Sequence, residues 1–408
     1  MNIQVPSPAP ATGASGLGSG TLPGLRSQVT SITRSHIRAI AELGAAMEDV
    51  VPLWFGEGDT PTPEFIRAAT AESLARGETF YTPNRGIGPL RQAIADYLTG
   101  LHARPVALNR VTATLSGMNA IMLAMQTIVD PGDRVVIVAP VWPNVREAVR
   151  VLGGEPVEVP LARDPDSGRF SMDLDRVLDA CDPRTKAIFV NSPGNPTGWV
   201  MPDSQVAALL DAARERGIWV LSDEVYSRLV YDGSPHAPSF LDHAAPDDPL
   251  IVINSFSKAW SMTGWRLGWL ITPPGLGDLL GKLTEFNVSC ATTFVQYGGI
   301  AALREGEGYV AELVARYGRA RRTIVEGLSS MRRVRVAEPE GAFYAFFSVD
   351  GESDSVALAY RLLHEARVGL APGLAFGNGG EAHLRLCFAA SDTLLNRALD
   401  RLRPVLDA

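Results

Sequence analysis

The stretch LIVINSFSKAWSMTGWRLGWL, residues 250–270, begins with a short apolar run and continues into hydroxyl side chains and a lysine, Lys258. The run is nearly continuous and rich in β-branched residues, which is typical of a strand buried on both faces of a parallel sheet. Lys258 therefore follows the end of a buried strand, eight positions before Arg266. Because parallel α/β sheets bind ligands beyond the carboxyl ends of their strands, this lysine is a candidate for chemistry.

Three earlier runs have the same apolar character, and helical patterns separate some of them. One such pattern, residues 203–217, ends at Gly217, a residue typical of the position after a helix. This alternation predicts an α/β fold with a mainly parallel sheet. After residue 305 a long helical pattern precedes the strands and helices of a smaller unit. The three runs are RVVIVAP (134–140), KAIFVNS (186–192) and WVLSDEVY (219–226).

The composition is that of an ordinary globular protein with room for two domains: 408 residues, 46% hydrophobic and 20% charged. A formal net charge of -8 without a basic block argues against a nucleic-acid or anionic-membrane partner. No apolar run reaches the roughly 18 residues of a membrane span, and the first residues lack the pattern of a signal peptide. We expect a cytoplasmic protein that works on small molecules.

The other residues that could form special sites show no useful spacing. Cys181, Cys290 and Cys387 are odd in number and far apart, which fits neither a disulfide framework nor a metal cluster. The six histidines likewise show no metal-ligand spacing, and no nucleotide-binding lysine loop is present. Residues 1–30 are rich in Pro, Gly, Ala and Ser, so we expect a flexible extension.

Polar groups follow the ends of three of the apolar runs. Ser192 to Gly198 follows one run, Asp223 and Tyr226 lie at the end of the next, and Ser255 and Lys258 follow the third. Since the carboxyl ends of parallel strands share one edge of a sheet, we expect these groups to meet there.

Four motifs in this order resemble those of one enzyme family: NSPGNPTG (191–198), SDEVY (222–226), SFSK (255–258) with Arg266, and HLRLCFA (383–389). The family is that of the fold-type I pyridoxal-phosphate aminotransferases of class I/II, which are similar to aspartate aminotransferase. The resemblance runs from about residue 31 to residue 404.

The resemblance implies a homodimer with shared active sites that moves the amino group of an L-amino acid to a 2-oxo acid. It also implies a large domain with a seven-stranded type of sheet over residues 66–304, which binds pyridoxal phosphate. A smaller α+β domain would comprise residues 31–65 and 305–408.

The resemblance assigns Lys258 to the Schiff base with the cofactor and to proton transfer at the substrate. A lysine in a partly desolvated, electropositive pocket suits both tasks, because its pKa falls toward neutrality. Asp223 would keep the ring nitrogen of the cofactor protonated, since a buried carboxylate needs a partner. Tyr226 and Asn195 resemble the donors to the phenolic oxygen of the cofactor, and Asn195 also borders the substrate.

The segment TLSGMNAIMLAMQTIV (114–129) is expected to turn from a strand into a helix at Ser116, Gly117 and Met118. The amide groups at a helix N-terminus favour a phosphate, although a simple helix cap explains a Ser-Gly turn equally well. Arg266 and the hydroxyl of Ser255 resemble the remaining phosphate ligands.

Four further residues match family positions. Trp142 resembles the aromatic residue that stacks on the cofactor ring, and Tyr81 resembles a tyrosine that reaches the phosphate of the neighbouring subunit. Arg385 matches the arginine that binds the substrate α-carboxylate, which suits a bidentate guanidinium. Gly56 matches a glycine whose backbone approaches the substrate. The chain has Gly58 where the family commonly has proline, which loosens this segment.

The side-chain specificity is left open by the sequence. Some dicarboxylate-specific relatives use an arginine from the partner subunit in the region that here reads EFNVSCATTFVQ (285–296), and this stretch has no Lys or Arg. The sequence therefore does not support strict specificity for aspartate. Arg85 is a candidate for binding a second carboxylate, whereas Trp54 and Phe55 are candidates for an apolar wall; packing or surface roles are equally open for all three.

Two alternatives to transamination remain at this level. A lyase, decarboxylase or oxidase acting on an amino acid would share the fold, the lysine and the phosphate site. A non-catalytic binding module is disfavoured, because the reactive lysine and aspartate are both present and no DNA-binding segment is appended.

Overall fold

The computed structural model describes residues 24–408, and its centre is a seven-stranded sheet in the order β2-β10-β9-β8-β7-β3-β4. All neighbouring strands run parallel except β10, which is antiparallel to both β2 and β9. The mainly parallel α/β sheet expected from the sequence is confirmed. Its strands are β2 (Val111–Thr114), β3 (Arg134–Ala139), β4 (Glu155–Pro160), β7 (Thr185–Asn191), β8 (Trp219–Asp223), β9 (Leu250–Ser255) and β10 (Gly268–Ile271).

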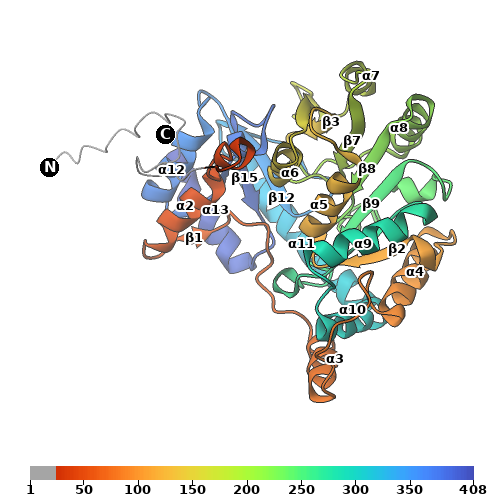
Figure 1. Ribbon diagram of the computed structural model, residues 1–408. Helices are drawn as coiled ribbons and strands as arrows, with labels where there is room; N and C mark the ends of the chain where they lie inside the picture. Colours follow the sequence, from red (N-terminus) through yellow and green to blue (C-terminus); the bar gives the residue numbers. More distant parts are fainter. Residues whose placement is uncertain (1–23) are drawn as a thin grey trace.

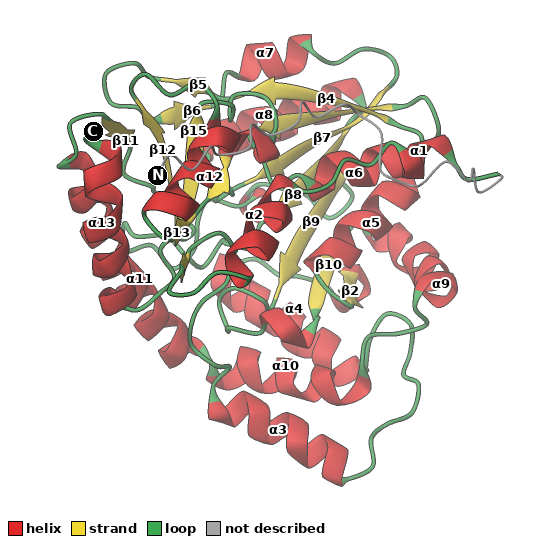
Figure 2. Ribbon diagram, turned by 90° about the vertical axis from the view of Figure 1, so that its left-hand side faces the viewer, coloured by secondary structure: helices red, strands yellow, loops and turns green. Residues whose placement is uncertain are grey.

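Helices cover both faces of this sheet, which explains why its strands are apolar throughout. In β3, Val135 and Ile137 pack against α5, α6 and α9 on one face, whereas Val136 and Val138 belong to the core on the other face. On that second face α3 and α10 lie side by side at one edge of the molecule (Figure 2). The covering helices are α3 (Glu64–Ala75), α4 (Gly88–His102), α5 (Gly117–Ile128), α6 (Asn144–Val151), α7 (Leu174–Asp179), α8 (Asp203–Arg216), α9 (Gly277–Asn287) and α10 (Thr293–Glu305).

A second hydrophobic core surrounds a four-stranded antiparallel sheet in the order β11-β12-β15-β14. Figure 1 shows its blue C-terminal elements together with the red α2 and β1, apart from the yellow and green strands of the large sheet. β1 also pairs in parallel with β13. The elements are α2 (His36–Ala45), β1 (Val51–Pro52), α11 (Glu307–Ser329), β11 (Val334–Val336), β12 (Tyr344–Val349), α12 (Ser355–Glu365), β13 (Val368–Gly369), β14 (Ala371–Pro372), β15 (His383–Cys387) and α13 (Asp392–Leu406).

Short elements complete the chain. The predicted end of the helix at 203–217 is confirmed, since Gly217 follows α8 in the left-handed conformation with φ of 63°. The remaining elements are α1 (Ser27–Thr30), β5 (Ala162–Arg163), β6 (Phe170–Ser171) and the 3₁₀ turns η1 (Leu108–Arg110), η2 (Phe240–Asp242), η3 (Thr263–Trp265), η4 (Pro274–Leu276) and η5 (Gly373–Phe376).

Most of the extension expected at residues 1–30 lies outside the described residues. Its described part contains α1, and Arg26 Nη2 donates a 2.8 Å hydrogen bond to the carbonyl of Val151 at the end of α6. Within residues 24–408, no helix is both long and apolar enough to cross a membrane.

Candidate active site

A cavity of about 340 Å³ lies beyond the carboxyl ends of β7, β8 and β9, between the large sheet and the four-stranded sheet. Residues that are far apart in the sequence meet there, as the alternation of strands and helices predicted. Eleven of the thirteen predicted site residues line it: Gly56, Gly117, Met118, Trp142, Asn195, Asp223, Tyr226, Ser255, Lys258, Arg266 and Arg385. The two others, Ser116 and Tyr81, do not.

Lys258 projects into this cavity from the turn that follows β9. Its Nζ donates a 2.6 Å hydrogen bond to the carbonyl oxygen of Gly56 and lies over the rings of Tyr226 and Phe343. Burial, together with the nearby guanidinium of Arg385, lowers the pKa of the ammonium to about 8. The side chain is therefore an amine that can lose its proton near neutral pH.

Residue 56 has to be a glycine because another side chain lies very close to its backbone. A Cβ atom at this position would overlap the hydroxyl group of Tyr344, at the start of β12. Glycine thus lets the carbonyl that receives Lys258 pass directly over the four-stranded sheet.

Asp223 is the last residue of β8, opposite Asn191 in β7. It is buried, and burial raises the pKa of its carboxyl to about 7, although the amide of Val225 donates to Oδ1 at 3.3 Å. Among residues 24–408 no lysine, arginine or histidine forms an ion pair with it, and Lys258 exerts only a weak opposing effect on this pKa. A cationic group in the cavity would supply the partner that this carboxylate lacks.

Arg385 is buried in the middle of β15 and forms no ion pair with any described residue. Its Nη1 donates to Asn195 Oδ1 at 2.8 Å, its Nη2 donates to the carbonyl of Trp54, and its Nε has no hydrogen-bond partner within the described part of the chain. The guanidinium is held between the rings of Tyr344 and Phe376. A fixed, buried and uncompensated guanidinium is suited to receive a carboxylate.

Tyr226 has its hydroxyl 2.7 Å from the hydroxyl of Tyr344. Burial raises the pKa of both phenols, so both remain neutral and able to donate. Sequence reasoning pointed to Tyr226 but missed Tyr344, because the apolar strand YAFFSV that carries it has no polar neighbours to mark it.

The N-terminus of α5 lines one end of the cavity through Gly117 and Met118. The Oγ of Ser116 caps this helix by accepting from the amide of Asn119 at 3.0 Å, which accounts for its position outside the cavity. The amide groups of Gly117 and Met118 belong to the first turn of the helix, where they have no partner inside the helix. A Cβ atom on Gly268 would approach the amide nitrogen of Gly117 to 2.9 Å, so this glycine also keeps the region clear.

Two predicted anion ligands border the same end. Ser255 Oγ donates to Ser257 Oγ at 2.8 Å and contacts the carbonyl of Leu267. Arg266 has a left-handed backbone with φ of 56°, and its Nη1 donates to the carbonyl of Thr263 at 2.6 Å. Together with the helix N-terminus, these groups form a positively polarised pocket for an anion.

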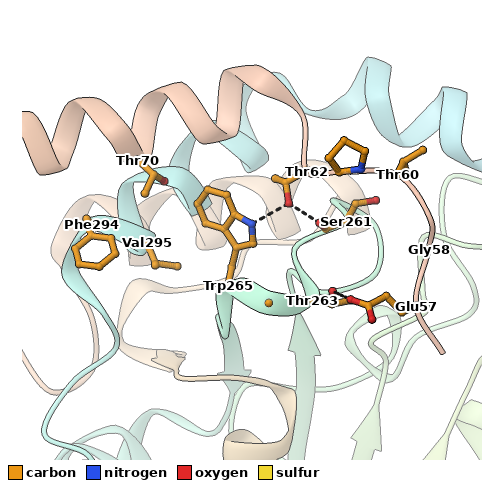
Figure 3. A pocket seen from close by; sticks show the side chains of 12 residues that line it. Glu57, Gly58, Thr60, Thr62, Thr70, Ser261, Thr263, Trp265, Phe294 and Val295 are labelled. Carbon is orange, nitrogen blue, oxygen red and sulfur yellow. Dashed lines mark hydrogen bonds between the residues drawn. The ribbon is translucent and has the colours of Figure 1, made fainter. Parts of the chain in front are cut away.

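A second hollow of about 480 Å³ shares Thr263 with the cavity and lies between the segment after Gly56 and the loop before Arg266 (Figure 3). Thr62 Oγ1 donates to the carbonyl of Ser261 at 2.6 Å and accepts from Trp265 Nε1 at 2.8 Å. These bonds tie the loop that carries Lys258 and Arg266 to the segment that carries Gly56.

The residues considered for side-chain specificity have different surroundings. Arg85 is held within its own chain, since Nε donates to Thr112 Oγ1 at 3.1 Å and Nη2 to the carbonyl of Val111 at 3.0 Å. Trp54 is buried in the second core, whereas Phe55 is exposed at the mouth of the cavity and lines it. Tyr81 is 88% exposed, outside the cavity of its own chain.

Sequence reasoning missed the contribution of α2. Ser35, Ile37 and Arg38 line the cavity, and the Oγ of Ser35 caps the helix by accepting from the amide of Arg38. The guanidinium of Arg38 is exposed and forms no ion pair or hydrogen bond with another described side chain. Its only signal in the sequence was a cation on an amphipathic helix that also carries His36 and Glu42, a pattern that solvated surfaces share.

Comparison with known proteins agrees with this geometry. The family profile of aminotransferase class I and II matches residues 48–402. An aspartate aminotransferase of Pyrococcus horikoshii is 34% identical over 383 residues, which cover 93% of this chain and 96% of that protein. Aromatic-amino-acid aminotransferase 2 of Thermococcus litoralis is 33% identical over 389 residues, or 94% of this chain and 98% of that protein.

A solved structure of aspartate aminotransferase from Thermus thermophilus with maleate superimposes with a TM-score of 0.87 at 34% identity, covering 94% of this chain and 100% of that one. The chain belongs to the class I and II aminotransferase family. It is an amino-acid aminotransferase, which confirms the fold class and the enzyme class that the four motifs predicted.

Proposed function

We propose that this aminotransferase holds pyridoxal phosphate in the cavity around Lys258 and transfers nitrogen from an amino acid with an acidic side chain. The observation that carries the cofactor assignment is Asp223, a buried carboxyl at the strand end near Lys258 that forms no ion pair with any residue from 24 to 408. A protonated pyridine ring is the partner that such a carboxyl requires.

The residues present fit the remaining parts of the cofactor. The first turn of α5, with Arg266 and Ser255, would hold the phosphate, and Trp142 would face the ring. Tyr226 and Asn195 would donate to the phenolic oxygen, as expected from the sequence. When bound, pyridoxal phosphate supplies an electron sink for the bonds to the α-carbon of the amino acid.

Lys258 is the residue of this chain that moves protons. With a pKa lowered to about 8, Nζ is neutral in roughly a tenth of molecules at pH 7 and in half of them near pH 8, and the neutral form can accept the proton from the α-carbon of the substrate. The carbonyl of Gly56 holds Nζ in place by accepting its hydrogen bond. Arg385 would bind the α-carboxylate and thereby orient the α-carbon toward Nζ.

The substrate side chain would meet Arg38 and Phe55 at the mouth of the cavity. Arg38 offers a cation on α2, in a chain whose segment 285–296 has none. The relatives named aspartate aminotransferase support an acidic side chain, whereas the one named for aromatic amino acids marks the alternative that Phe55 would favour.

We also propose a homodimer and a division into two domains, comprising residues 66–304 and residues 31–65 with 305–408. The separate cores around the two sheets support the division. The exposed rings of Phe80 (80%), Tyr81 (88%) and Phe286 (87%) support the dimer, because single chains rarely leave such rings in water.

Two experiments test this proposal. Borohydride reduction of the yellow holoprotein, followed by peptide mapping, should place the cofactor on Lys258 rather than on Lys186 or Lys282, the only other lysines. A panel of amino donors with several 2-oxo acids should then yield a new amino acid, with glutamate and aspartate as the best donors. Release of amine, ammonia or peroxide as the main product would overturn the assignment of transamination.

A further inference from the structure

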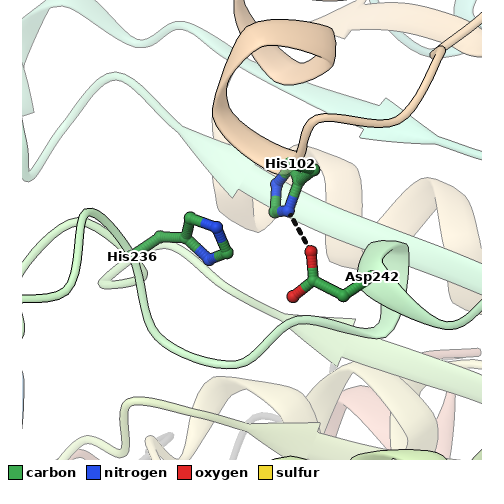
Figure 4. A group of neighbouring side chains, drawn as sticks. All are labelled: His102, His236 and Asp242. Atoms are coloured by element: carbon green, nitrogen blue, oxygen red, sulfur yellow. Dashed lines mark hydrogen bonds and ion pairs between the residues drawn. The ribbon is translucent and has the colours of Figure 1, made fainter.

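His102, His236 and Asp242 form a cluster that the catalytic cavity does not include (Figure 4). His102 is the last residue of α4, His236 lies in the loop after β8, and Asp242 ends η2. One ligand atom from each side chain lies within 4.8 Å of the others. We propose that this cluster binds a divalent transition-metal ion, with zinc as the best match to two imidazoles and one carboxylate.

A hydrogen bond of the His236 ring determines which of its two nitrogens could bind a metal ion. Its Nδ1 lies 2.7 Å from the carbonyl oxygen of Ala237, and because a carbonyl can only accept, the proton must reside on Nδ1. The lone pair is therefore on Nε2, which is the nitrogen left for coordination. A backbone carbonyl that fixes the tautomer of a histidine in this way is a common feature of metal sites.

Asp242 is held in a similar manner. Its Oδ2 accepts from the amide of Ser239 at 2.9 Å, which leaves Oδ1 directed at His102 Nδ1 at 2.7 Å. The Oγ of Ser239 in turn donates to the buried carboxylate of Glu224 at 2.7 Å, so the turn that carries Asp242 is anchored to the large sheet. Arg104 contacts the backbone carbonyl of Asp242, so its guanidinium does not pair with the carboxylate, and an ion at Oδ1 would compete only with the contact to His102.

The two imidazole rings of this cluster lie against each other. The ring centroids of His102 and His236 are 4.4 Å apart, and the side chain of His102 is only 3% exposed. Ligand atoms around a tetrahedral zinc ion lie about 3.3 Å apart, so atoms that lie within 4.8 Å of one another would have to approach by at most about 1.5 Å, which side-chain rotation can provide.

The role of the ion follows from the two parts of the chain that it would join. It would connect the end of α4 with the loop and turn at residues 232–242, and His102 and Asp242 are 140 positions apart in the sequence. No member of the cluster lines the catalytic cavity. Three protein ligands leave the fourth position of a tetrahedral ion to water. We therefore assign to the ion a stabilising role, in which it favours the folded chain by binding it in preference to the unfolded chain.

Zinc binding by untagged holoenzyme provides the test. Equilibrium dialysis against ZnCl₂, followed by elemental analysis, should show one saturable equivalent per chain, and the melting temperature should rise with the zinc concentration. His236→Ala should weaken this binding at least tenfold and abolish the rise in melting temperature. Asp242→Asn should weaken binding as well, while the amide oxygen can still accept from Ser239.

His243→Ala is the matched control. His243 is also paired with an aspartate, since its Nε2 lies 2.7 Å from Asp203 Oδ1, but the described residues offer it no third ligand. Circular dichroism without metal establishes that each variant is folded. Equal zinc affinity in the wild type and in His236→Ala, or no saturable uptake by the wild type, would overturn the proposal.

Discussion

Lys258 Nζ and the carbonyl oxygen of Gly56 form a 2.6 Å hydrogen bond between residues 202 positions apart. This bond joins the turn after β9 to the segment that leads from β1 toward α3. Both segments line the same cavity. Because the carbonyl of Gly56 holds the amine, the position of the amine depends on how closely the backbone at residue 56 approaches Tyr344 of the four-stranded sheet.

Gly56→Ala should therefore damage the enzyme through Tyr344. The added methyl group would overlap the hydroxyl of Tyr344, which has to move and release Tyr226. We expect kcat to fall at least tenfold, with far-UV circular dichroism unchanged. In Gly56→Ala with Tyr344→Phe, removal of the hydroxyl should recover part of the loss, up to the activity of Tyr344→Phe alone. A double variant with a kcat no higher than that of Gly56→Ala would contradict this explanation.

The amine of Lys258 should react with acylating reagents at unusually low pH. Its pKa is lowered to about 8 by burial, so in the apoprotein the neutral form increases as the pH rises through about 8. The rate of labelling at Lys258, followed by mass spectrometry of its peptide, should rise with a midpoint near that pH. The exposed side chain of Lys282 is the internal control, and a midpoint for Lys258 above pH 10 would contradict the expectation.

Asp223 should make the apoprotein less stable as the pH rises. Its folded pKa of about 7 exceeds the ordinary value of 3.8, so between these values the folded chain holds a proton that the unfolded chain has released. The free energy of unfolding should then fall by up to about 1.4 kcal/mol per pH unit between roughly pH 4 and 7. Urea unfolding of Asp223→Asn should lack this contribution, and parallel pH profiles for the two proteins would rule it out.

The α/β fold and most of the cavity could be predicted from the sequence, because each strand and the polar residue that it places in the cavity are neighbours in the chain. Each apolar run marks a strand, and the polar residue that follows it is placed at one edge of the sheet by the parallel topology, as for Asp223 and Lys258. Tyr344 and Arg38 could not be found in this way. They reach the cavity from the second core and from α2, and their positions depend on how the two cores pack together.

Arg38 should affect the choice of substrate more than the turnover number. If its guanidinium binds an acidic side chain, Arg38→Ala should raise KM for glutamate and aspartate about tenfold and leave KM for apolar donors nearly unchanged. Arg34→Ala is the matched control, because Arg34 precedes the same helix but pairs with Glu42. Equal changes in KM for acidic and apolar donors would show that Arg38 acts on structure and not on specificity.

Tyr81 should act in the active site of the neighbouring subunit. Its ring is 88% exposed and outside the cavity of its own chain, whereas Arg85 is bonded within the chain and fixes the base of this loop. Lys258→Ala and Tyr81→Ala each place one defect in every site of a homodimer. In a mixed dimer with Tyr81 acting across the interface, one site carries both defects and the other carries none.

Mixing the two inactive variants under conditions of subunit exchange should therefore restore activity toward half of the wild-type value per mixed dimer. Isolation of the mixed dimer with two different affinity tags fixes its fraction, and a mixture of Lys258→Ala with Asp223→Ala is the control. Both residues of that control lie in the cavity of one chain, so each of its sites keeps a defect and activity should stay at the level of the parents. If Tyr81 acts within its own chain, the Tyr81→Ala mixture will behave like this control.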